Sequence, residues 1–197
     1  MTPTPDAQPT ESTTSADVEE NSGKIDLTKR LAYVSQEKSI GVIEAMEEPA
    51  DIAALRERVQ DTTEMKFLRV SVDNRRGGEA AEIGIVTGID ENGKKYTFGP
   101  LQNYILEVMM DPSLSDYEDA QGTLQEQLSQ LGDKYEKIVW YPDSADVVLV
   151  TTDLPLPEYF ESMEISPHYL TLEEVVPLED VADQAPLDFE VPEENRR

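Results

Sequence analysis

The chain has 197 residues and a formal net charge of -26 at pH 7, from 42 acidic and 16 basic side chains, and it contains no cysteine. These values exclude disulfides, thiolate metal sites and cysteine nucleophiles, and they disfavour direct contact with the phosphates of a nucleic acid. No apolar run approaches the ~18 residues that span a bilayer, and the first residues lack the basic and apolar segments of a signal peptide. We therefore expect a cytoplasmic or virion protein that is not secreted by a signal peptide and makes no membrane contact.

The charge divides the chain into three parts. Residues 1–23 carry five acids and no base, whereas residues 138–195 carry 15 acids and no base. The section between them has the mixed charge of an ordinary domain. With the other sequence features described below, this predicts an acidic low-complexity arm at 1–24, a core domain at 25–153 and an extended, proline-rich acidic arm at 154–197. The first arm is too rich in Thr, Ser and Pro to order itself by apolar burial.

The first half of the core domain contains one ambiguous and four clear patterns. Residues 25–46 show mixed periodicity, which fits one helix or a helix and a short strand. Residues 49–59 begin with proline and place apolar side chains on one side, which predicts a helix. The alternating run 66–73 and the β-rich runs 82–89 and 94–98 predict a three-stranded antiparallel meander.

The stretch GIDENGKK at 88–95 resembles a phosphate-binding loop but lacks its hydroxyl residue, because Lys95 stands there. It also resembles a calcium-binding EF-hand loop, but Gly88 and Gly99 occupy the two positions that require acids. Asn92-Gly93 between two β runs is the strongest short hairpin signal. The sequence therefore predicts a turn here, with both central residues at positive φ, and no nucleotide or calcium site.

The second half of the core domain predicts two helices and two strands. Apolar spacing indicates helices at 101–110 and 115–131, the second capped by Ser115 and ended by Gly132. Runs 137–142 and 145–152 predict short strands. The expected fold class is α+β: a small antiparallel β-meander with packed helices, plus the two acidic arms.

The C-terminal arm is broken by prolines at 155, 157, 167, 177, 186 and 192, which disfavour any long helix or central strand. It is nevertheless rich in apolar residues that need burial, so it should wrap its own domain or a neighbour. If it docks on a neighbour, deleting 154–191 should leave a folded domain that cannot assemble. The residues predicted to dock are Leu154, Leu156, Tyr159, Phe160, Met163, Ile165, Tyr169, Leu170, Leu187 and Phe189.

No set of residues predicts a catalytic, cofactor or metal site. The single histidine, His168, has no serine or aspartate partner at a recognisable spacing, so a surface or packed role is expected. The abundant acids make chance carboxylate pairs common and therefore unspecific. Residues 75–78, Arg-Arg-Gly-Gly, are predicted to form a polar turn rather than an anion-binding site. Trp140 and Tyr141 are predicted to be core residues at the end of a strand, since a surface that stacks on nucleic-acid bases would need cationic surroundings.

The acidity has three interpretations: a solvated surface adapted to high salt, arms that dock on neighbours, or imitation of a nucleic acid. Mimicry needs acids on a rigid surface, whereas the densest acids here lie on proline-broken segments. The sequence therefore predicts a non-enzymatic structural protein with protein partners in a large homo- or hetero-oligomeric assembly, most concretely a capsid- or tail-associated virion component from a halophilic or acid-proteome system. The alternative is a soluble acidic regulator or nucleic-acid-mimic inhibitor of a basic protein.

Overall fold

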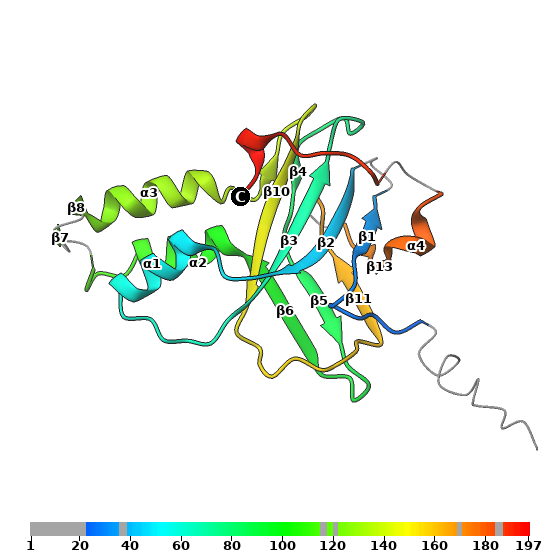
Figure 1. Cartoon of the computed structure of the whole chain (residues 1–197), viewed down its shortest axis with the longest axis horizontal. Helices are drawn as coiled ribbons and strands as arrows, with labels where there is room; N and C mark the ends of the chain where they lie inside the picture. The colour runs from blue at the N-terminus through cyan, green and yellow to red at the C-terminus, as the bar shows by residue number, and fades with distance from the viewer. Residues whose placement is uncertain (1–22, 36–38, 115–117, 120–121, 169–170, 184–186) are drawn as a thin grey trace, which may run out of the picture.

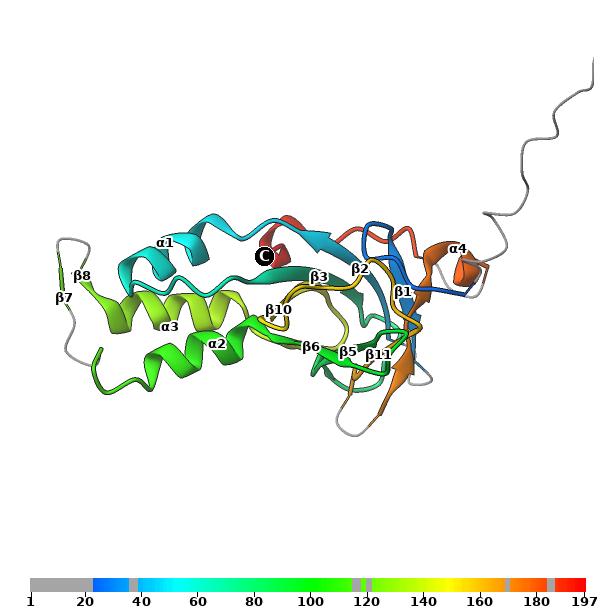
Figure 2. The same cartoon turned by 90° about the horizontal axis from the view of Figure 1, so that it is seen from below.

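The computed structural model describes residues 23–35, 39–114, 118–119, 122–168, 171–183 and 187–197. The three longest helices lie together on one side of the molecule and a strongly curved sheet forms the other, while a short fourth helix lies beside the sheet (Figures 1 and 2). This mixture of helix and antiparallel sheet confirms the α+β class.

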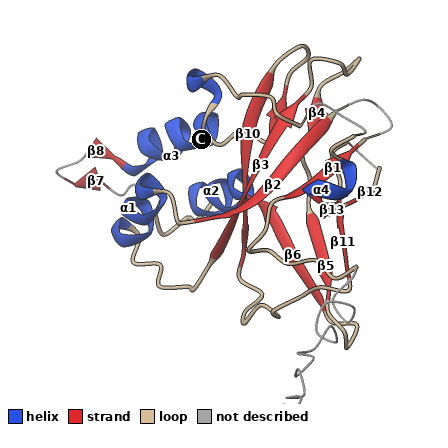
Figure 3. Ribbon diagram, turned by 45° about the vertical axis from the view of Figure 1, so that its right-hand side comes forward, coloured by secondary structure: helices blue, strands red, loops and turns tan. Residues whose placement is uncertain are grey.

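Nine strands pair, all antiparallel, in the order β12-β11-β5-β6-β10-β3-β2-β1-β13. Their bounds are β1 Leu31–Val34, β2 Ile40–Met46, β3 Lys66–Asp73, β5 Val86–Ile89, β6 Lys95–Pro100, β10 Ser144–Thr151, β11 Ser162–Ile165, β12 Glu173–Glu174 and β13 Val176–Pro177. Figure 3 shows the sheet in red.

The sheet comes close to closing into a barrel because its two outermost strands are neighbours in the chain. Only Val175 separates β12, which pairs with β11, from β13, which pairs with β1. Val175 is itself buried among the interior side chains. One short segment therefore bonds to both edges of the sheet, which protects edges that would otherwise expose unpaired backbone groups.

The barrel interior is filled by alternating residues of its central strands. In β3, Leu68, Val70 and Val72 point inward, and Val147 and Leu149 of β10 join them. This inward set follows from the period of two that a pleated strand imposes on its side chains. Tyr33 and Phe160 fill the space beside two glycines: a Cβ on Gly41 would lie 2.2 Å from the Tyr33 ring, and one on Gly88 would lie 2.5 Å from the Phe160 ring.

A second core lies between the sheet and three helices, α1 Ala50–Arg58, α2 Leu101–Met109 and α3 Leu124–Lys134. Each helix buries one apolar stripe, as an amphipathic helix on a domain surface does. The buried side chains of this cluster are Ile52, Leu55, Phe67, Leu101, Ile105, Leu124, Leu128, Leu131, Tyr135 and Val148.

Six short elements complete the described part of the fold. Two separate small ladders pair β4 Ala81–Glu82 with β9 Ile138–Val139, and β7 Glu118–Asp119 with β8 Gly122–Thr123. Helix α4, Leu178–Val181, follows β13. A 3-10 turn at Glu193–Asn195 lies against β10, where the Asn195 side chain donates to the carbonyl oxygen of Ser144 at 2.9 Å.

Several predicted elements are confirmed and others are wrong. The helices at 49–59 and 101–110 and the strand at 66–73 form as predicted. The ambiguous stretch 25–46 instead contains the strands β1 and β2 and no helix among its described residues. The predicted meander is wrong, because β3 pairs with β2 and β10 and does not pair with β5; the other two strands of the predicted meander, β5 and β6, do pair as a hairpin.

Two local predictions differ in detail. The helix predicted at 115–131 begins at Leu124, where the Thr123 hydroxyl accepts from the Glu126 N–H, and it continues past Gly132; Ser115 lies outside the described residues. The hairpin turn has Gly93 at φ +77° while Asn92 keeps negative φ. The Gly93 N–H donates to the Asp90 carbonyl at 2.9 Å, so this is a type I turn followed by a left-handed glycine.

The C-terminal arm is largely part of the domain. Strands β11, β12 and β13 belong to the nine-stranded sheet, and Phe160 bridges to Ile25. Among the described prolines of this arm, Pro155 and Pro157 lie between β10 and β11, Pro167 follows β11, Pro177 ends the two-residue strand β13 and Pro192 precedes the 3-10 turn. Pro186 lies outside the described residues. The N-terminal arm, up to residue 22, lies outside the described residues.

Candidate functional site

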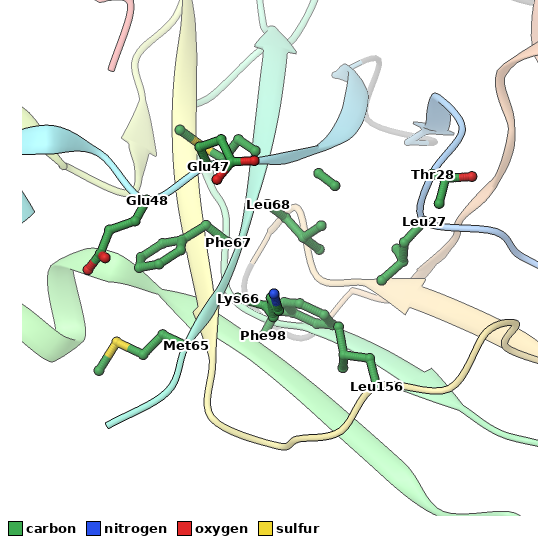
Figure 4. A pocket seen from close by; sticks show the side chains of 12 residues that line it. Leu27, Thr28, Glu47, Glu48, Met65, Lys66, Phe67, Leu68, Phe98 and Leu156 are labelled. Carbon is green, nitrogen blue, oxygen red and sulfur yellow. The ribbon is translucent and has the colours of Figure 1, made fainter. Parts of the chain in front are cut away.

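A groove with a volume of about 550 Å³ opens where the barrel meets the helical core (Figure 4). Its floor consists of the buried side chains of Phe67, Leu68 and Phe98. Leu68 and Phe98 belong to the barrel interior, whereas Phe67 belongs to the helical cluster. The groove therefore follows the seam between the two cores.

The walls of the groove are apolar and only partly buried. Leu27 and Leu156 pack against the barrel core, and Met46 and Met65 pack against the helical core. Figure 4 shows Leu27 and Leu156 on one side of the groove and Met65 on the other. Methionine is flexible and polarizable, so such walls adapt to the shape of an apolar ligand.

Charged residues stand at the mouth of the groove. Glu47 and Lys66 are exposed, and Glu48 is held by the Arg56 guanidinium at 2.6 Å. Arg56 also lies 3.5 Å from a carboxylate oxygen of Asp61. Glu48 thus has a fixed position and a neutralising partner, whereas the Glu47 carboxylate is presented to solvent.

Asp61 anchors this charged network to the helices. The Tyr104 hydroxyl of α2 donates to its carboxylate at 2.7 Å. Burial favours the neutral acid, but the hydrogen bonds from Thr63 and Tyr104 and the charge of Arg56 outweigh it and lower the pKa of Asp61 to about 2. Burial, and then the hydrogen bond to this carboxylate and its charge, raise the pKa of Tyr104. The wall that carries Glu48 is therefore held in place at neutral pH.

The groove residues suit recognition of apolar side chains. Its described lining consists of Leu, Met, Phe, Ala and Thr side chains with three charged groups at the mouth, and no histidine, serine or tyrosine occurs among these described residues. Within the described parts of the chain, no group of three or more His, Asp or Glu side chains is placed to hold a metal ion.

His168 is not among the residues that line the groove, and its side chain is packed. Its Nε2 lies 3.2 Å from the hydroxyl oxygen of Ser39, a residue 129 positions away in the chain. Ser39 is fully buried and His168 is 8% exposed. The His168 carbonyl accepts from the hydroxyls of Ser166 and Thr171. A serine nucleophile must be reached by its substrate, so this geometry favours the packed role.

The residues predicted to dock on partners fall into a buried group and a partly exposed group in the structure. Phe160, Met163 and Ile165 are buried inside the chain's own barrel, and Leu187 is buried in a small outer cluster against β1 and β2. Another group remains partly exposed; it consists of Leu154, Leu156, Tyr159 and Phe189. Only Leu156 of this group lines the groove. Tyr169 and Leu170 lie outside the described residues.

Trp140 and Tyr141 are not core residues, contrary to the sequence prediction. They are 56% and 52% exposed, in the connection between β9 and β10. The nearby Arg75 donates from Nε and Nη2 to the two carboxylate oxygens of Asp73, at 2.9 and 2.8 Å. The turn at 75–78 is thus polar, as predicted, with one arginine engaged by an aspartate.

Sequence reasoning missed the groove because its lining comes from five separate chain segments. No spacing or motif relates Leu27, Met46, Met65, Phe98 and Leu156. The only usable signal is the presence of Leu and Met beside charged or turn residues, and that signal is common.

No protein-family model, curated protein or solved structure matches this chain. Among the described residues, the helices are too short or too polar to cross a membrane.

Proposed function

We propose that the protein is a non-enzymatic component of a larger protein assembly, and that it binds an apolar segment of a protein partner in the groove. The proposal rests on one observation, which is the open groove with walls of Leu and Met side chains over a floor of Phe67, Leu68 and Phe98. A ligand side chain that becomes buried there gains roughly 1.5–3 kcal/mol, depending on its size.

The charge at the mouth indicates the chemistry of the partner segment. Glu47 is exposed, and the chain as a whole carries a formal charge of -26. A partner segment with an apolar centre and a flanking Lys or Arg complements both features. A capsid- or tail-associated virion component from a halophilic host is the concrete form of this proposal, and its support is the acidic composition.

The groove takes the place of the C-terminal arm as the principal docking surface. Phe160, Met163 and Ile165 are engaged within the barrel, and withdrawing them to reach a neighbour would expose its interior. Leu156 is different, because it is partly exposed and lines the groove. It is therefore the predicted docking residue that most directly tests the proposal.

The test begins with the mass of the native particle, measured by sedimentation and light scattering on material from its own source in low and in molar salt. We expect a large, discrete species. Leu156→Glu should remove the chain from this particle, since a carboxylate cannot be buried unpaired in the groove. Leu172→Glu is the matched control, because Leu172 is 64% exposed and lies outside the groove.

Two outcomes contradict the proposal. The first is incorporation of the Leu156→Glu chain at the level of the control. The second is a small species in both salts, which would favour the acidic regulator, tested by a salt-sensitive stoichiometric complex with a basic protein.

A further inference from the structure

The end of the barrel beyond Asp73 carries two exposed aromatic residues beside two arginines. Trp140 and Tyr141 each expose more than half of their surface. Arg75 and Arg76 are exposed on the neighbouring turn that follows β3. We call these four residues the aromatic tip. Trp, Tyr and Arg are the residue types most enriched where protein interfaces gain their binding energy.

The aromatic tip is held rigid by a buried asparagine. Asn74 is fully buried, and its Nδ2 donates to the carbonyl oxygens of Glu79 and Val139, at 2.7 and 3.0 Å. Its backbone N–H donates to the Asp143 carbonyl at 3.0 Å. The two loops that carry the aromatic tip are thus joined by one side chain. Such preorganisation reduces the entropy lost on binding.

The aromatic tip and the groove lie at opposite ends of the same strand. Met65 and Phe67 of the groove stand at the start of β3, and Arg75 follows its end. The upper end of β3 and its lower end are well separated in Figure 1. Eight residues of strand separate them by roughly 23 Å, at about 3.3 Å per residue. A single copy therefore cannot place its own aromatic tip in its own groove.

We infer that the aromatic tip of one copy docks in the groove of a second copy, an inference that rests on the proposed function of the groove. The rings of Trp140 and Tyr141 match the apolar walls, and Met46 and Met65 offer sulfur contacts to aromatic rings. The exposed Arg76 complements the exposed Glu47 at the mouth.

This contact joins two different surfaces, so it is head-to-tail. Such an interface leaves one free aromatic tip and one free groove on every dimer, and it continues into a ring or a filament.

The high negative charge of each copy opposes association, and the exposed acids Glu79 and Asp143 beside the aromatic tip add to the repulsion. Molar salt shortens the screening length from about 10 Å to about 3 Å and removes most of this repulsion. The association should therefore be stronger in 1 M NaCl than in 0.1 M NaCl.

The experiment uses the purified full chain in 1 M NaCl, with sedimentation velocity over a range of protein concentrations. We expect concentration-dependent oligomers. Replacing both Trp140 and Tyr141 by Ser should raise the dissociation constant about tenfold or more. Leu172→Ser, which removes an exposed apolar residue elsewhere, should leave it unchanged. Circular dichroism confirms that each variant is folded.

Mixing two defective chains tests the head-to-tail geometry directly. The Trp140→Ser/Tyr141→Ser chain keeps its groove, and the Leu156→Glu chain keeps its aromatic tip. Each alone should remain monomeric, whereas an equimolar mixture should form dimers that grow no further. In addition, Arg76→Glu should weaken the association, and Glu47→Arg on the partner chain should restore it.

A monomeric wild-type chain at every concentration in 1 M NaCl would overturn the inference. So would double-serine chains that associate like the wild type. If either result accompanies a large native particle that requires Leu156, the proposed function of the groove stands and its occupant is another protein. If the native particle does not require Leu156, the proposed function fails as well.

Discussion

Replacing Gly88 by alanine tests whether the C-terminal segment packs on its own domain. A Cβ at Gly88 would lie 2.5 Å from Cδ1 and 2.7 Å from Cε1 of the Phe160 ring. This ring is 1% exposed and meets the Tyr96 ring edge-on at a centroid distance of 5.6 Å, so it has no space to withdraw. Overpacking of this kind costs about 1–3 kcal/mol. We expect Gly88→Ala to lower the free energy of unfolding by that amount.

Gly99→Ala is the matched control, because Gly99 also lies in a strand but a Cβ there meets no atom within 4 Å. This substitution should stabilise the protein by about 0.4–1 kcal/mol, since it restricts the unfolded chain. The free energies of unfolding come from urea titrations at fixed salt and at several protein concentrations. In a Phe160→Ala background, whose own cost is about 3–5 kcal/mol, the penalty of Gly88→Ala should largely disappear.

The refuting result is a Gly88→Ala protein with the same small stabilisation as Gly99→Ala. It would mean that Phe160 does not rest on Gly88 of the same chain in solution. The C-terminal segment would then pack on a neighbour, and its apolar residues would return as docking residues.

Three further predictions concern the whole domain. A chain ending at Asp153 lacks β11, β12 and β13, so we expect it to lose cooperative urea unfolding, and a cooperative transition would contradict the barrel. Asp61→Asn should lower the free energy of unfolding by about 1–2 kcal/mol at pH 7. The folded pKa of Asp61 lies below its ordinary value of 3.8, so its contribution is complete above that value and is lost as the pH falls from 4 to 2. Urea titrations of the wild type and of Asp61→Asn should therefore show a smaller difference in the free energy of unfolding at pH 2.5 than at pH 7. An equal difference at both pH values would refute the ionised Asp61 carboxylate as the origin of the stabilisation. Finally, raising NaCl from 0.1 to 1 M should raise the thermal midpoint, because it screens the self-repulsion of a chain with net charge -26; an unchanged midpoint would show that the acids are too far apart to repel.

The local features of this protein could be predicted from the sequence. The strand at 66–73 and the helix at 49–59 follow from apolar periodicities of two and about 3.6, which depend only on nearby residues. The turn before Gly93 follows in the same way, because glycine relieves the steric cost of positive φ. The acidic, cysteine-free composition likewise belongs to the sequence alone.

The pairing of distant segments could not be predicted. Residues 25–46 show no clear pattern because Gly41 interrupts it, and the reason for Gly41 is the Tyr33 ring that lies over it from the neighbouring strand. The sequence prediction placed 162–165 in an arm because prolines surround it, yet this segment pairs with β5 once the barrel brings the two together.

Only the tertiary structure decided where the candidate site lies and which apolar residues remain outside. Leu156 and Phe160 are four residues apart in one proline-rich stretch, yet one lines the groove and the other fills the barrel. Trp140 follows a buried valine but is exposed. Composition and periodicity determine what a segment tends to form by itself. Burial depends on which distant segments reach it, and that is settled by the packing of the whole chain.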